Sequence, residues 1–81
     1  MKSTNVLSYT VFFEHASEGG YVAFVPSLPG CASQGETFEE TTKIIKDAIN
    51  GYLAVLQEDH DEIPVEEKEH IAATVMVPLP A

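Results

Sequence analysis

The sequence predicts a small α+β domain of β-β-β-α-β order, in which one helix packs on an antiparallel-rich sheet. Three patterns indicate this class. Apolar residues alternate on both sides of Gly19-Gly20, helical periodicity runs over residues 38–56, and a second alternation lies near the carboxy terminus. A chain of 81 residues with 44% hydrophobic content is sufficient for one folded domain, spanning residues 1–81.

The amino-terminal part predicts a β-hairpin. Residues 6–14 alternate between apolar and polar side chains, and residues 21–25 form the returning strand. Gly19 and Gly20 supply the positive φ angles that a hairpin loop often needs. Phe12 falls among the polar positions of the first strand, so apolar surface remains on the outer side of the pair. This surface is covered either by the rest of the chain or by another subunit.

A corner follows the hairpin. Pro26 and Pro29 end the second strand because proline cannot donate a ladder hydrogen bond, and a short third strand is predicted between Gly30 and Gly35. Cys31 is the single cysteine, which excludes an internal disulfide and fits a reducing, cytoplasmic location. A small packing residue is the favoured interpretation of Cys31 over a reactive thiol.

The helix has the clearest sequence signals. Thr37 and Glu40 are spaced as a capping box, and the apolar stripe after them predicts a helix over residues 38–56. Gly51 interrupts this helix at a cost of about 1 kcal/mol relative to alanine. Such a glycine is expected where the helix packs closely on the sheet.

The carboxy-terminal part begins with an acidic connector, residues 57–70, in which Pro64 prevents the helix from continuing. The alternating stretch 71–77 then predicts a final strand, which Pro78 and Pro80 end.

Charge and side-chain chemistry exclude several classes of function. Thirteen acids against four basic residues give a net charge of −9, which argues against binding nucleic acid directly. The amino terminus has neither a signal peptide nor a membrane span. The cysteine and three histidines lack catalytic or zinc spacing, and Glu14 is the one acid on a predicted strand. We therefore expect no enzyme activity, catalytic residue, metal or cofactor.

Residues 8–59 resemble the core of the HicB-like antitoxins. The resemblance rests on Gly-Gly-Tyr at 19–21, on a corner of the form P-x-LPG-C-x-S-x-G-x-T at 26–37, and on Tyr-Leu at 52–53. Ser27 stands where relatives often have an acid. The motif positions that we expect to be structural are Gly19, Gly20, Pro26, Pro29, Gly30, Cys31, Gly35 and Thr37.

The resemblance implies a partial ribonuclease-H-like fold and a type II antitoxin. Such a protein neutralises a small basic HicA-like mRNA-cleaving toxin by covering its active site. It also implies a homo-oligomer, a dimer or a tetramer. Many relatives carry a DNA-binding domain after this core, but the residues after Asp59 contain no basic helix, so none is expected here.

Partner contacts are expected at an outer aromatic residue, at the acidic connector and at the final strand. The predicted partner-binding residues are Phe12, Glu58, Asp59, Asp61, Glu62, Glu66 and Glu67. An alternative function is a stand-alone oligomeric adaptor or regulatory module without a toxin partner. A degenerate nuclease rests on fold analogy alone and is the weakest alternative.

Overall fold

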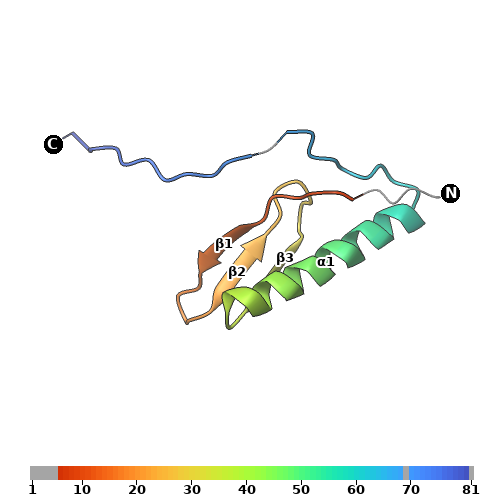
Figure 1. The fold of residues 1–81 in the computed structure, drawn as a ribbon, viewed down its shortest axis with the longest axis horizontal. Coiled ribbons are helices and arrows are strands. Elements are labelled where there is room, and N and C mark those ends of the chain that lie inside the picture. The colour runs from red at the N-terminus through yellow and green to blue at the C-terminus, as the bar shows by residue number, and fades with distance from the viewer. Residues whose placement is uncertain (1–5, 69, 81) are drawn as a thin grey trace.

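The computed structural model describes residues 6–68 and 70–80, and it contains one sheet and one helix (Figure 1). The strands are β1 (Phe12–His15), β2 (Tyr21–Phe24) and β3 (Ala32–Gly35), and the helix is α1 (Phe38–Glu58). The sheet has the order β1-β2-β3, and both strand pairs are antiparallel. This arrangement confirms a small α+β domain with its helix packed on an antiparallel sheet.

The hairpin β1–β2 forms as predicted but is shorter. Phe12 pairs with Phe24, and the loop uses positive φ angles of 100° at Gly19 and 80° at Gly20. In this register the partner of residue 10 would be Pro26, which has no N–H group. The ladder therefore begins at Phe12, and residues 6–11, the lead segment, precede it without strand pairing.

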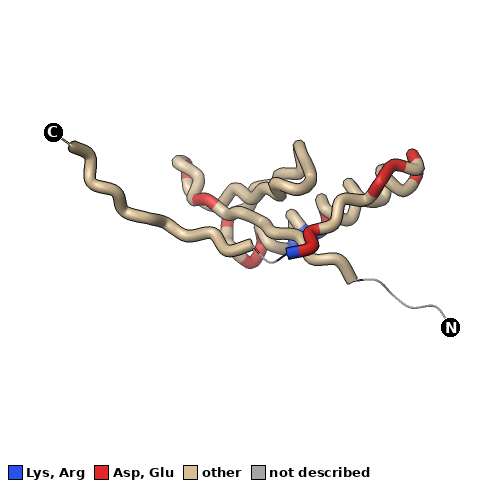
Figure 2. Tube along the Cα trace, turned by 90° about the horizontal axis from the view of Figure 1, so that it is seen from above, with Lys and Arg blue, Asp and Glu red and all other residues tan. Residues whose placement is uncertain are grey.

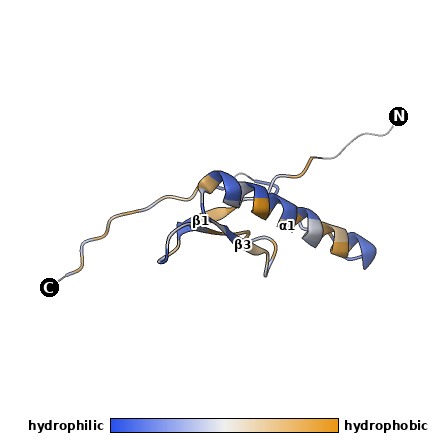
Figure 3. Ribbon diagram, turned by 90° about the horizontal axis from the view of Figure 1, so that it is seen from below, coloured by the Kyte–Doolittle hydropathy of each residue, from blue (hydrophilic) through white to orange (hydrophobic). Residues whose placement is uncertain are grey.

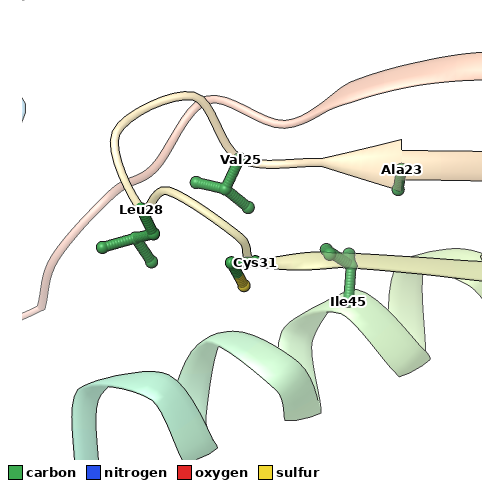
Figure 4. Packing of buried hydrophobic residues seen from close by; sticks show 5 residues of the cluster. All are labelled: Ala23, Val25, Leu28, Cys31 and Ile45. Atoms are coloured by element: carbon green, nitrogen blue, oxygen red, sulfur yellow. The ribbon is translucent and has the colours of Figure 1, made fainter.

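The corner folds back on itself and supplies much of the core. The N–H group of Val25 donates to the carbonyl of Cys31 at 3.0 Å, and Cys31 donates to the carbonyl of Leu28 at 2.9 Å. Leu28 is fully buried and Cys31 is 5% exposed, so both side chains belong to the core. Figure 4 shows the buried cluster of Ala23, Val25, Leu28, Cys31 and Ile45, in which Ile45 rises from α1 toward the sheet.

The start of α1 agrees with the capping signal. The Thr37 hydroxyl oxygen accepts from the N–H group of Glu40 at 3.0 Å, as in a capping box. The Glu40 carboxylate accepts from the N–H group of Glu36 at 3.1 Å, one residue earlier than the standard box. The helix ends at Glu58, two residues later than predicted, and Asp59 caps it.

Gly35 and Gly51 differ in whether they affect the packing of α1 on the sheet. A Cβ atom on Gly35 would lie 2.6 Å from the Thr41 hydroxyl oxygen, so Gly35 permits the close approach of the first helical turns to β3. A Cβ atom on Gly51 would meet no heavy atom within 4 Å, and Gly51 is exposed. The expectation that Gly51 packs on the sheet is therefore wrong.

The helix lies obliquely over one side of the sheet. Its backbone comes close to β3 and β2, but among the described elements it does not come close to β1. The Tyr52 hydroxyl donates to the Pro29 carbonyl at 2.9 Å and ties the second half of α1 to the corner. The sheet face below β1 is therefore less covered than the rest.

The predicted final strand does not form in the single chain. The described residues 70–80 contain no helix or strand, and the segment extends away from the body (Figure 1). The radius of gyration is 15.9 Å, against about 12 Å for a compact chain of this length. A strand requires a neighbouring ladder for its backbone groups, and residues 71–77 have no such neighbour in the described part of this chain.

Candidate partner-binding surfaces

The outer sheet face carries an aromatic pair. The rings of Phe12 and Phe24 pack edge to face, with centroids 5.4 Å apart and an interplanar angle of 87°. Phe12 remains 36% exposed on the face opposite α1, because its neighbour Phe13 packs against the core. Ile71 and Ala72 border a hollow of about 370 Å³ beside Phe12. The chain thus borders this aromatic surface without covering it fully.

Four of the predicted acidic residues gather at the carboxy-terminal end of α1. Glu58, Asp59, Asp61 and Glu62 are all exposed, and Figure 2 shows this acidic group at one end of the molecule. The last turn of α1, all of it described, contains no basic residue. The carboxylates of Glu58 and Asp59 lie at the negative pole of the helix dipole, where negative charge is unfavourable. We call these four residues the acidic helix end.

Glu66 lies apart from that group and bonds within the chain. Its carboxylate accepts from the Thr10 N–H group at 2.8 Å, from the Thr10 hydroxyl at 2.7 Å and from the Ser27 hydroxyl at 2.9 Å. These hydrogen bonds, above all the one from the Thr10 backbone, lower the pKa of the Glu66 carboxyl. Nearby, the Tyr9 hydroxyl donates to the Pro64 carbonyl, and burial is the main cause that raises the pKa of Tyr9.

Sequence reasoning did not identify Thr10 and Ser27 as partners of Glu66. Thr10 is 56 positions from Glu66 and Ser27 is 39 positions away, and no local pattern connects them. The family resemblance marks position 27 as one where an acid is common, and this chain has a serine there. In this chain its hydroxyl donates to a carboxylate, which an acid at the same position would repel. Glu67, the remaining predicted residue, is exposed on the connector.

An apolar groove of about 570 Å³ lies between the β1 side of the sheet and α1. The helix backbone lies close to β3 and β2 but not to β1, and Phe13 of β1 reaches the start of α1 at Phe38, with ring centroids 4.5 Å apart. Lys46 is the one charged residue among its described lining residues. Its walls include Tyr9, Val11 and Phe13 on one side and Ile45, Ile49 and Leu53 on the other. We call it the β1–α1 groove; the apolar periodicities indicated its walls, but not that a gap separates them.

Cys31 is buried, and the described residues contain no candidate metal site. Burial raises the pKa of the Cys31 thiol, so the nucleophilic thiolate is disfavoured. No group of three or more His, Cys, Asp or Glu side chains in residues 6–68 and 70–80 could hold a metal ion. No helix within these residues is long and apolar enough to cross a membrane.

The fold and its surfaces define a small α+β module whose exposed features are acidic and apolar. The chain belongs to the HicB-like antitoxin family, because the model of the "HicB_like antitoxin of bacterial toxin-antitoxin system" matches residues 9–78. This match confirms the family that the corner motif indicated.

Individual relatives agree with this assignment. A UPF0150 protein of Synechocystis sp. is 45% identical over 62 residues, covering 76% of this chain and 78% of the relative. A UPF0150 protein of Thermoplasma acidophilum is 40% identical over 65 residues, which cover 80% of this chain and 94% of that relative. Antitoxin HicB 1 of Photorhabdus laumondii is 34% identical over 59 residues, which cover 73% of this chain and 38% of that antitoxin.

Proposed function

We propose that this chain is an antitoxin-type binding protein that neutralises a small basic HicA-like mRNA-cleaving toxin by covering its active site. The observation that carries the proposal is the acidic helix end, in a chain of net charge −9 that belongs to an antitoxin family. The chain acts by binding, without a catalytic step of its own, and works in the cytoplasm.

The four side chains of the acidic helix end are exposed to solvent. Glu58 and Asp59 lie at the negative pole of α1, Asp61 and Glu62 follow directly, and the described last turn contains no basic residue. An RNA-cleaving protein binds phosphate groups through lysine and arginine, so its substrate surface is basic. A clustered acidic surface would accelerate encounter with that protein and compete with RNA for the same side chains.

The outer aromatic surface complements the acidic one. Interfaces draw most of their affinity from a few desolvated aromatic or arginine side chains, and charged residues around them steer association. Phe12 is a partly exposed aromatic side chain held in place by Phe24. We assign apolar contact to Phe12 and electrostatic steering to the acidic helix end together with Glu67. Glu66 holds the connector in place through Thr10.

The test uses purified toxin from the same genome and measures association rates with the full chain at low and high salt. One variant neutralises the acidic helix end: Glu58→Gln, Asp59→Asn, Asp61→Asn and Glu62→Gln. The matched control removes the same charge from exposed acids elsewhere: Glu18→Gln, Glu36→Gln, Glu39→Gln and Asp47→Asn. The first variant should associate at least several-fold more slowly, with a weaker salt dependence. Equal slowing in both variants would contradict a localised steering surface.

One observation favours the alternative of a stand-alone oligomeric adaptor. Apolar side chains between residues 71 and 79 are highly exposed, as expected of a segment that contacts another protein chain. The two functions differ in their partner. An adaptor without a toxin would leave RNA cleavage by every HicA-like protein of the genome unchanged.

A further inference from the structure

Residues 71–77, the tail segment, have the pattern of a strand but lack a neighbour. Ile71, Val75 and Val77 share one side of this alternation and are 91%, 76% and 79% exposed. Figure 3 shows the tail carrying hydrophobic colours while it stands clear of the sheet and helix. Isolated apolar side chains on a surface are ordinary, but a continuous exposed strand of them indicates an interface.

The sheet offers a matching site at β1. This strand pairs with β2 on one side, and in the described part of the chain its other backbone edge is unpaired. The β1–α1 groove opens beside it, with Val11 and Phe13 on the sheet wall and Ile49 on the helix wall. An added strand would satisfy the backbone groups of β1 and fill the groove with every second side chain.

Charge favours a neutral occupant of this groove. Its described lining contains Lys46 as its one charged residue, and the tail segment contains no charged residue. A basic toxin would find no carboxylate in the described lining. The tail and the groove are also the surfaces through which two copies, each of net charge −9, can meet with the least repulsion.

The chain's own tail is directed away from the groove. Pro64 lies beside Tyr9 and Glu66 beside Thr10, so the connector runs in the same direction as the lead segment. Beyond the connector, residues 70–80 extend away from the body instead of lying along β1 (Figure 1). The tail also starts on the Phe12 side of the sheet, opposite the groove.

We propose that the tail segment of one copy adds as an extra strand to the free edge of β1 in a second copy, with its Ile71, Val75 and Val77 side chains in the β1–α1 groove. Reciprocal exchange gives a homodimer in which each sheet has four strands. The proposal does not rest on toxin binding, because every residue it uses belongs to this chain.

The first experiment measures the mass of the full chain by light scattering across a dilution series. The wild type should have twice the 8.8 kDa mass of one chain. Val75→Asp should raise the dimer dissociation constant at least tenfold, because it places a charge in the groove. Thr74→Asp is the matched control: it adds the same charge on the opposite side of the same strand and should leave dissociation nearly unchanged. Both positions are exposed in the single chain, so neither change should prevent its folding.

The second experiment separates exchange between copies from folding back within one chain. A photo-cross-linking residue at position 75 is activated in a mixture of isotopically light and heavy protein. Links between light and heavy chains, ending in residues 9–13 or 45–53, are expected. Links confined to single chains would overturn the proposal. So would a strictly monomeric wild type, equal effects of the two aspartate variants, or a tail that binds only when the toxin is added.

Discussion

The carboxylate of Glu66 accepts two hydrogen bonds from Thr10, at 2.8 Å from the backbone N–H group and 2.7 Å from the hydroxyl, across 56 positions of sequence. Ser27 adds a third at 2.9 Å. This contact joins the connector after α1 to the lead segment before β1, and so determines where the tail leaves the body.

Replacing Glu66 with glutamine should destabilise the fold by about 1 kcal/mol or less near neutral pH. The effect is small because the Glu66 side chain is only half-buried. The folded-state pKa of Glu66 is lowered from its ordinary value of 4.5, so the charged carboxylate stabilises the fold above that value. The benefit is lost as the pH falls through the lowered pKa. Urea unfolding of wild type and variant should therefore differ at neutral pH and converge in strong acid.

The control for this experiment is Glu67→Gln, which removes the same charge from the exposed neighbouring residue. It should leave unfolding nearly unchanged. A Glu66→Gln difference that persists undiminished in acid would show that the variant acts through something other than the carboxylate.

Tyr52→Phe should reduce stability by roughly 0.5–1 kcal/mol, since it removes the hydrogen bond to a solvent-accessible Pro29 carbonyl and leaves the aromatic ring in place. Thermal unfolding is the measurement. Tyr21→Phe on β2 serves as a comparison, and an equal loss in both variants would count against a specific bond between helix and corner.

Two glycine-to-alanine changes should have opposite signs. Gly51→Ala should stabilise the fold by about 1 kcal/mol, because the site is an exposed helix interior with open space for a Cβ atom. Gly35→Ala should destabilise it, because the new atom would lie 2.6 Å from the Thr41 hydroxyl oxygen. Chemical denaturation of both variants checks the pair; destabilisation by Gly51→Ala would contradict the helix placement.

The Cys31 thiol should react slowly with alkylating reagents in the native protein. Burial raises its pKa and also blocks access, so the thiolate is scarce and shielded. The alkylation rate, followed by mass spectrometry, should rise by at least tenfold when denaturant unfolds the chain. A native rate equal to the unfolded rate would contradict a buried thiol.

Features encoded by neighbouring residues were predictable from sequence. The capping contact between Thr37 and Glu40 spans three positions, and the hairpin glycines, Gly19 and Gly20, require only their own φ angles. Such local signals determine where elements begin and end. They identified the hairpin loop, the corner and the first helical turn.

Features that depend on distant residues were not predictable in the same way. The bond between Glu66 and Thr10 has no periodic pattern, and the packing role expected at Gly51 belongs instead to Gly35. The tail segment illustrates a third case. Its alternating side chains are typical of a strand. A strand also needs a neighbouring strand for its backbone hydrogen bonds, and the alternation does not show whether one is present.

The most direct test of the proposed function is a titration of RNA cleavage. Purified HicA-like toxin from the same genome is mixed with increasing amounts of the full chain, and cleavage of a messenger RNA is followed over time. Neutralisation by an antitoxin predicts that cleavage falls to background at a fixed ratio of the two proteins. The variant lacking the charges of the acidic helix end should require more protein. Cleavage that continues at the full rate in a large excess of this chain would contradict the proposed function.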